Sequence, residues 1–297
     1  MALIQTRLGL ANSAAAGTGM VLTSTGEVLT NNHVIRGATQ IRVRVTAKGR
    51  TYRARVLGYS VSADVALLKL VGASGLATVS VGNSSTVELG DDVTAVGNAG
   101  GTGKLTTKQG SITALGRSIT VSDGQGLSAR LTHLLETDAG VESGDSGGPL
   151  LDTAGRVVGM TAAASFAFGA RSTSSDGYAI PINRAMSIVR QIERSQSSAS
   201  VHIGATPFLG VSADTRSFGD VGGVVVAGVQ EGSPAARAGL DAGDTIVSFN
   251  GNAVTTYSKL VARLLRWHPG DKVRLAWVDR FGIRDAGTVV LTSGPPQ

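Results

Sequence analysis

No cysteine occurs among the 297 residues of the sequence. Disulfide bridges and thiolate metal sites are therefore excluded, and the fold does not depend on the redox state of its compartment. No apolar run reaches the roughly 18 residues that a membrane-spanning helix needs, so we predict no membrane span. No signal peptide precedes the strand-like segment "ALIQTRLGL", and we expect that any export segment was trimmed before this numbering begins.

Aromatic residues are also scarce, at 4% of the chain, and they do not show the basic and aromatic pattern of a nucleic-acid-binding surface. We therefore expect no nucleic-acid partner. The net charge is +6, and the densest basic run, residues 41–56, has six basic residues and no acid. Arg42 and Arg44 alternate there with Ile41, Val43 and Val45, which is strand periodicity. A solvated strand face is the favoured interpretation, and an anion-binding patch is the alternative.

Glycine is abundant instead, with 41 residues that separate short runs of valine, isoleucine and leucine. Short strands joined by tight turns predict a barrel or sandwich for the first part of the chain. We expect strands over 18–23, 27–30, 41–46, 51–58, 65–71, 92–97, 110–116, 156–162 and 177–181, and then a helix over 181–195. The predicted domains are 1–195, a polar linker over 196–204, and a small α+β domain over 205–297.

The segment "SGDSGGPLLD", residues 143–152, surrounds one serine with glycines. Ser146 is either a turn residue or a nucleophile whose glycines let a substrate come close. A serine nucleophile needs a base within reach, and the base needs an orienting group. Gly144, Ser146 and Gly148 also match the nucleophile elbow of α/β-hydrolases, but here a strand follows where the elbow requires a helix. The elbow is therefore disfavoured.

Four histidines are candidates for the base: His33, His133, His202 and His268. His33 lies where a predicted strand ends in a polar corner, in "VLTNNHVI". Asp64 directly precedes the apolar strand "VALLKL", where a carboxylate is desolvated unless it has a partner. An imidazole N–H fits that need, so the order His33, Asp64, Ser146 is favoured. His133 is interpreted as a strand or loop histidine.

The segments "LTNNHVI", "ADVALLKL" and "GDSGGPL" resemble the three catalytic segments of trypsin-like serine proteases. Together with "TDAGVESGDSGGPL", "GYAIPI" and "FLGV", they resemble the HtrA branch, closest to its secreted actinobacterial members. The resemblance covers nearly the whole chain. It implies an all-β double β-barrel protease domain followed by a small α+β PDZ domain. It assigns His33 as general base, Asp64 as its orienting group and Ser146 as nucleophile, with Gly144 and Ser146 N–H groups forming the oxyanion hole.

The resemblance also implies a substrate pocket whose floor, Gly140, has no charge to pair with a P1 lysine or arginine. A small or medium apolar P1 residue is therefore expected. The predicted pocket residues are Gly140, Val141, Thr161, Ala162 and Ala163. Many HtrA proteins carry asparagine before the nucleophile, whereas this chain has Asp145. Either an internal arginine pairs with Asp145 or its carboxylate stays partly hydrated, because an unpaired buried carboxylate is costly.

The segment "PFLGV", residues 207–211, resembles the carboxylate-binding loop of HtrA PDZ domains. A helix near 258–267 would form the other wall of a peptide groove. The residues expected to bind peptide are Phe208, Leu209, Gly210, Val211, Leu260 and Leu264. Core packing is the alternative interpretation for Leu264.

These patterns predict a serine endopeptidase that acts on unfolded or exposed protein segments, with no metal and no cofactor. The expected partners are protein or peptide substrates, and C-terminal peptides at the PDZ domain. A homo-oligomer is possible, although residues 1–20 contain no aromatic residue of the kind on which many HtrA trimers rely. The expected location is secreted or in the cell envelope. Two alternatives stay open, a chaperone-like peptide-binding protein with low turnover and a serine esterase.

Overall fold

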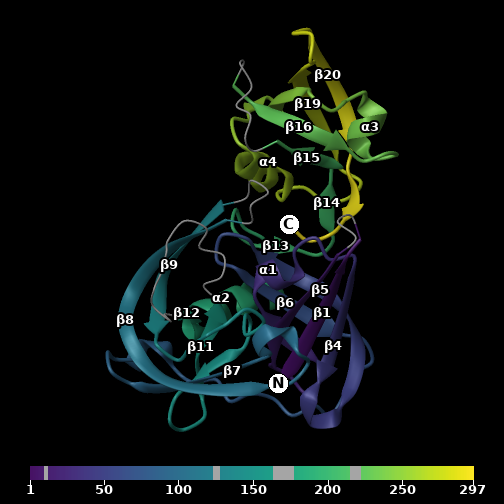
Figure 1. The fold of residues 1–297 in the computed structure, drawn as a ribbon. Helices are drawn as coiled ribbons and strands as arrows, with labels where there is room; N and C mark the ends of the chain where they lie inside the picture. The colour runs from purple at the N-terminus through teal and green to yellow at the C-terminus, as the bar shows by residue number, and fades with distance from the viewer. Residues whose placement is uncertain (10–12, 123–127, 163–176, 215–221) are drawn as a thin grey trace. The chain divides into compact units, whose positions relative to one another are not determined.

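The computed structural model describes residues 1–9, 13–122, 128–162, 177–214 and 222–297. The chain forms two compact units. The first comprises residues 1–121, 129–204 and 296–297, and the main part of the second is residues 205–295 (Figure 1). No helix in these described ranges is both long and apolar enough to cross a membrane.

Six strands at the start of the first unit close into a barrel. They are β1 (Ala2–Leu8), β2 (Ser13–Val21), β3 (Glu27–Thr30), β4 (Gln40–Val45), β5 (Arg50–Ser60) and β6 (Val65–Leu70). The order is β5-β4-β1-β2-β3-β6, and β5 also pairs with β6, which closes the ring. In β4, Ile41, Val43 and Val45 are buried while Arg42 and Arg44 are exposed. The predicted alternation is therefore confirmed, and the basic side chains face solvent.

A second closed barrel follows in the same unit. Its strands are β7 (Asp92–Gly97), β8 (Thr106–Ser122), β9 (Ser128–Thr137), β10 (Pro149–Leu151), β11 (Val157–Ala162) and β12 (Gly177–Pro181). They close in the order β10-β11-β12-β9-β8-β7. The sequence prediction captured only the middle of β8 and did not include β9. The predicted double β-barrel is confirmed.

Helix α2 (Ile182–Glu193) contributes its apolar face to a core cluster of the first unit. The buried face contains Ala185, Ile188, Val189 and Ile192, as their helical spacing predicts. The same cluster joins Leu29 and Leu67 of the first barrel with residues of the second, so the two barrels share a core. Strand β13 (His202–Ile203) pairs with β5, so the end of the predicted linker, residues 196–204, belongs to the first unit.

The second unit is an α+β fold. Its sheet runs β15 (Val211–Ala213), β16 (Val224–Val229), β17 (Thr245–Phe249), β19 (Lys272–Val278) and β20 (Arg284–Val290), with β18 (Asn252–Ala253) on β17. A separate ribbon pairs β14 (Thr206–Phe208) with β21 (Thr292–Gly294).

Both helices in the described part of the second unit begin at a hydroxyl cap. In α3 (Pro234–Ala238), Ser233 Oγ accepts a hydrogen bond from Ala236 N. In α4 (Tyr257–Leu264), Thr256 Oγ1 accepts from Lys259 N. Such caps satisfy N–H groups that a helix leaves unpaired at its start. Gly239 ends α3 at φ 90°, a left-handed conformation that suits glycine.

Candidate active site

His33 and Asp64 meet because two neighbouring strands bring them to one edge of the first barrel. Strand β3 pairs antiparallel with β6, with Thr30 opposite Ala66. His33 lies just after β3, in the short helix α1 (Asn32–Ile35), and Asp64 lies just before β6. The end of one strand is therefore beside the start of the other.

The Asp64 carboxylate contacts His33 through both oxygens. His33 Nδ1 is 2.7 Å from Asp64 Oδ2, and His33 N donates to Asp64 Oδ1 at 2.9 Å. Asn31 Nδ2 donates to the carbonyl of Asp64 at 2.9 Å, which fixes the backbone there. Since Asp64 is 6% exposed, the carboxylate is largely removed from water. A carboxylate on Nδ1 fixes the tautomer that leaves Nε2 as the basic nitrogen.

Ser146 lies on the loop between β9 and β10 and is 4% exposed. Its carbonyl accepts a hydrogen bond from Thr18 N, at 2.8 Å, which ties the loop to β2. A Cβ built on Gly17 would lie 2.7 Å from Val34 Cγ1 and 3.3 Å from the Ser146 carbonyl oxygen. The side chain of Val34, which follows His33, and the carbonyl of Ser146 therefore both lie close to Gly17 in β2. The structure brings the three sequence-predicted catalytic residues to one region.

The glycines around Ser146 are required by close backbone contacts. Gly144 and Gly147 have φ of 96° and 84°, which side-chain-bearing residues rarely adopt. A Cβ on Gly144 would lie 2.2 Å from the Asn98 carbonyl oxygen, and one on Gly147 would lie 2.2 Å from that of Thr18. A Cβ on Gly148 would lie 2.2 Å from the carbonyl oxygen of Val96. These glycines let the loop press against both barrels.

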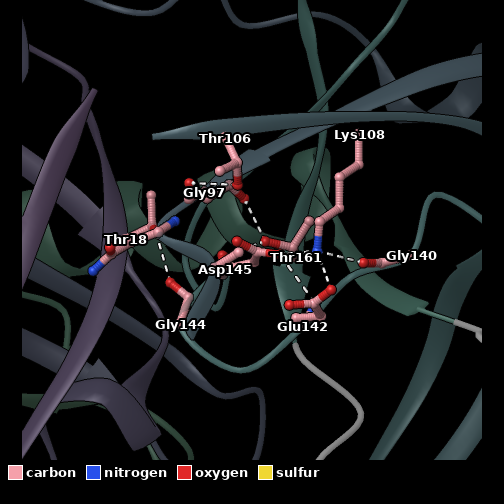
Figure 2. A network of polar contacts seen from close by, with 12 residues as sticks. Thr18, Gly97, Thr106, Lys108, Gly140, Glu142, Gly144, Asp145 and Thr161 are labelled. Carbon is pink, nitrogen blue, oxygen red and sulfur yellow. Dashed lines mark hydrogen bonds and ion pairs between the residues drawn. The ribbon is translucent and has the colours of Figure 1, made fainter. Parts of the chain in front are cut away.

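The backbone carbonyls of Ser143 and Gly144 both accept hydrogen bonds from other parts of the protein. The Ser143 carbonyl accepts from Gly100 N at 2.8 Å. The N–H of a trans peptide points opposite to its C=O, so the Gly144 N–H points away from Gly100. The next carbonyl, that of Gly144, accepts from Thr18 Oγ1 at 2.8 Å (Figure 2). Both carbonyls are therefore engaged by the protein.

Thr18 is a site residue that sequence reasoning missed. Its hydroxyl donates to Gly144 and accepts from Asn98 N at 2.9 Å, so it joins β2 to two loops of the second barrel. Its carbonyl accepts from Thr30 Oγ1 at 2.7 Å. The available signal was "GTG", residues 17–19, three small residues inside an otherwise apolar strand.

Lys108 is the second site residue that sequence reasoning missed, and it is the cation near the Asp145 carboxylate. Its ammonium lies 3.5 Å from Asp145 Oδ2 and 2.9 Å from Glu142 Oε1, and it donates to the Gly140 carbonyl at 2.8 Å (Figure 2). The sequence left two alternatives open for Asp145, an internal arginine or partial hydration; the cation near its carboxylate is instead a lysine from β8.

The residues predicted for the substrate pocket fall into two groups. Gly140 and Val141 lie on the loop before the nucleophile, and Val141 packs against the core of the second barrel. Thr161 is fully buried, and its hydroxyl donates to the Asp145 carbonyl at 2.6 Å, so that hydroxyl supports the nucleophile loop. Ala162 is 3% exposed, and Ala163 lies outside the described residues.

The other three histidines have different surroundings. His133 is exposed on β9, with Nδ1 3.1 Å from Thr132 Oγ1. His202 is buried beside Tyr59, at 5.3 Å between ring centroids. His268 belongs to the second unit. Within the described ranges, no cluster of histidine, aspartate and glutamate side chains is suited to hold a metal ion.

Comparison with known proteins agrees with this geometry. Residues 17–160 match the trypsin-like peptidase domain, and residues 225–279 match the PDZ domain. A solved structure of the HtrA-type protease AlgW with decapeptide is 30% identical, with a TM-score of 0.54, over 96% of this chain and 85% of that one. This chain belongs to the HtrA-type serine proteases. The predicted trypsin-like and PDZ domains are thereby confirmed.

Curated relatives of this HtrA chain include the periplasmic pH-dependent serine endoprotease DegQ of Escherichia coli, 36% identical over 87% of this chain. Another is the putative serine protease HhoB of Synechocystis, 34% identical over 88% of this chain. The chain spans 55% of DegQ and 62% of HhoB, so it covers little more than half of these relatives.

The segment 207–211 of this HtrA chain is held in place through its backbone carbonyls. The carbonyls of Leu209 and Gly210 accept from Ala235 N at 3.0 Å and from Gln230 N at 2.8 Å. Gly210 has φ of 86°, and a Cβ there would lie 2.1 Å from Ser233 Cβ. Phe208 and Val211 are half-buried on β14 and β15. Strand β15 is an edge of its sheet, so its outer side can pair with an added strand.

The leucines predicted to bind peptide lie deeper than a groove wall requires. Leu209, Leu260 and Leu264 are 2%, 1% and 5% exposed and belong to the core cluster of the second unit. For Leu264, the alternative of core packing fits this burial. The side chains of these leucines therefore belong to the core of the second unit.

Proposed function

We propose that this HtrA-type chain is a serine endopeptidase that cleaves unfolded or exposed protein segments through an acyl-enzyme. The observation that carries the proposal is the contact of Asp64 with His33 at 2.7 Å and 2.9 Å, beside a serine held in a glycine-rich loop. A base with a fixed tautomer next to a serine is the arrangement that activates a hydroxyl. DegQ and HhoB bear protease names, which supports the same class.

In the first half of the reaction, His33 Nε2 takes the proton of Ser146 Oγ as the oxygen attacks the scissile carbonyl. Asp64 stabilises the imidazolium that results. The carbonyl oxygen becomes an oxyanion, which the N–H groups of Gly144 and Ser146 would bind. The C–N bond then breaks, and His33 passes its proton to the departing amine.

The acyl-enzyme is resolved by the same steps with water as nucleophile. His33 removes a proton from water, the hydroxide attacks the ester, and the second oxyanion forms in the same place. The C–O bond to Ser146 breaks, and His33 returns the proton to Ser146 Oγ. The products are a carboxylic acid and an amine, and the enzyme is regenerated.

Labelling of the native chain by a fluorophosphonate probe tests the proposal, because the probe reports the nucleophile and its activation together. We expect stoichiometric labelling at Ser146, together with cleavage of casein. Labelling without cleavage of any peptide or protein would favour the chaperone-like alternative, with the PDZ unit as its binding part. Turnover of esters alone would favour the esterase.

Peptides with valine, alanine, leucine or isoleucine at P1 are expected to be cleaved faster than matched lysine or arginine peptides. Gly140 offers no negative charge to a P1 cation, and the nearby Glu142 carboxylate is already paired with the Lys108 ammonium at 2.9 Å. Profiling a peptide library with P1 varied at a constant flanking sequence measures the preference. Dominant cleavage after arginine or lysine would contradict it.

The PDZ unit is proposed to bind peptides by a free, apolar C-terminus. The peptide N–H groups of Leu209 and Gly210 make no hydrogen bond to any residue in the described part of the chain. They can therefore hold a carboxylate while the peptide adds as a strand to β15. AlgW, a structural relative, is described with a decapeptide and with a tripeptide.

Amidation of the peptide C-terminus is expected to weaken binding by at least about 1.5 kcal/mol, the scale of a charge-assisted hydrogen bond. Calorimetry with the Ser146→Ala chain and one hydrophobic peptide, free and then amidated, measures the difference without cleavage. Equal affinity for the two forms would show that this unit does not recognise a carboxylate.

We propose a secreted or cell-envelope location, because DegQ is named periplasmic. The predicted closeness to actinobacterial members stays a prediction, since DegQ and HhoB come from Escherichia coli and Synechocystis. A homo-oligomer also stays a prediction.

A further inference from the structure

We propose that Lys108 is a positioning residue: its ammonium fixes the segment 140–145, and with it the direction of the Gly144 N–H, as an internal counter-charge for Asp145. This inference deepens the proposed serine-hydrolase function and rests on it. Lys108 lies on β8, and Asp145 directly precedes Ser146. Lys108 would act on the reaction only through the loop, and does not itself touch the reacting atoms.

The carboxylate of Asp145 is buried. The residue is 2% exposed, and Gly97 lies so close that a Cβ there would be 2.4 Å from Asp145 Oδ1. Oδ1 has no hydrogen-bond partner among the described residues, and Oδ2 accepts from Glu142 N at 3.0 Å. A buried carboxylate is costly without a cation. Among the described residues, Lys108 is the only lysine or arginine whose side-chain nitrogen lies within 4.0 Å of the Asp145 carboxylate.

The Lys108 ammonium also reaches Gly140, at the other end of the segment 140–145. Lysine has three donors and no acceptor. The Lys108 ammonium donates to the Gly140 carbonyl at 2.8 Å and forms ion pairs with Glu142 Oε1 at 2.9 Å and Asp145 Oδ2 at 3.5 Å (Figure 2). Gly140 and Gly144 have φ of 61° and 96°, and glycine has no intrinsic preference for that sign. Contacts from outside the segment therefore hold it in one conformation, and Lys108 adds to those that Gly100 N and Thr18 Oγ1 make with its carbonyls.

The segment 140–145 includes Gly144, whose N–H is a donor of the candidate oxyanion hole. Asp145 N donates to the Glu142 carbonyl at 3.0 Å, and its own carbonyl accepts from Thr161 Oγ1 at 2.6 Å. The backbone of Asp145 is continuous with the peptide that carries the Gly144 N–H. If the carboxylate loses its cation, it gains by moving toward water, and that movement rotates the Gly144 peptide. The triad would remain while its oxyanion donor is displaced.

Glu142 competes for the same ammonium but contributes little to holding it. Its side chain is 63% exposed, and an exposed ion pair is weak because water and salt screen it. We therefore expect Glu142→Gln to lower kcat less than twofold. A loss as large as that of Lys108→Met would show that the pair with Glu142, and not the pair with Asp145, holds the loop.

The variants Lys108→Met, Lys108→Arg, Asp145→Asn and the double variant Lys108→Met/Asp145→Asn test the proposal in the full chain. We expect Lys108→Met to lower kcat at least tenfold with KM changed less than threefold, and Lys108→Arg to restore most of the loss. Asparagine needs no cation, so Lys108→Met should cost less than twofold in the Asp145→Asn background. Additive losses in this double-mutant cycle would overturn the proposal.

Lys69→Met is the matched control. Lys69 is paired with Glu27 at 3.7 Å, and its side chain is 26% exposed, against 24% for Lys108. We expect this variant to have native kcat. If Lys69→Met and Lys108→Met lose activity in proportion to thermal stability, the role of Lys108 is only structural and the proposal fails.

Hydrogen–deuterium exchange of the peptide that covers residues 140–148 supplies a readout that does not need activity. We expect faster exchange in Lys108→Met than in the native chain or in Lys69→Met. If the native chain is neither labelled nor active, the proposed function fails, while the exchange data still decide whether Lys108 orders the loop. Unchanged exchange together with unchanged labelling in Lys108→Met would overturn the positioning role alone.

Discussion

Replacing Ser146 by alanine is expected to abolish fluorophosphonate labelling and to lower peptide turnover by about 10⁶, the scale on which removal of a triad serine acts. The change removes one hydroxyl and leaves the backbone bond from Thr18 N to the Ser146 carbonyl in place. The fold should therefore persist. Mass spectrometry of the labelled protein and rates of casein cleavage measure the two effects, and circular dichroism confirms the fold.

Ser62→Ala provides the matched control for this experiment. Ser62 is exposed and close in sequence to Asp64, but its hydroxyl contacts only Ser60 Oγ, at 3.5 Å, among the contacts described. It should label and cleave like the native chain. Casein cleavage that survives in a highly purified Ser146→Ala sample would contradict the assignment of the nucleophile.

Replacing Asp64 by asparagine is expected to lower kcat by about 10⁴ with little change in fold. Asparagine is nearly the same size, so the bond from His33 N to the side-chain oxygen can persist. Its amide N–H₂ would face Nδ1, however, and the imidazole would turn to the tautomer that protonates Nε2. His33 then cannot accept the serine proton. Steady-state kinetics on one peptide substrate measure the loss.

Asp92→Asn is the control for the change of charge. Asp92 is an exposed carboxylate at the start of β7, so its replacement should leave kcat within about twofold. The assignment of Asp64 would be refuted by an Asp64→Asn chain that retains native kcat. A drop in kcat matched by loss of the folded state would instead show that Asp64 is needed only for folding.

Local patterns in the sequence predicted much of this fold. The alternation in β4 identified the buried face of the strand, and the spacing in α2 identified the apolar side of the helix. Strand β9 was missed because its pattern is broken. His133 has φ of 58°, and the buried positions on its two sides, Leu131 and Leu134, are three residues apart. A period of two cannot be recognised across such a break.

The candidate site was predicted where its residues lie within motifs, and missed where they act across the fold. His33, Asp64 and Ser146 each lie in a characteristic segment. Lys108 is one lysine in "TTKQGS", and nothing in that segment indicates that β8 directs its ammonium to Asp145. Contacts between distant segments depend on the register of the strands, which local sequence does not define.

Thr18 contacts the nucleophile loop from the other barrel, and this has a consequence for synthesis of the protein. Residues 1–70, which contain His33, Asp64 and Thr18, leave the ribosome and can form their barrel before the loop of Ser146 exists. The loop in turn is held by Thr18 on one side and by Thr161 on the other. A nascent or half-folded chain therefore lacks a competent centre. In the proposed mechanism, hydrolysis would begin only after both barrels have formed and docked.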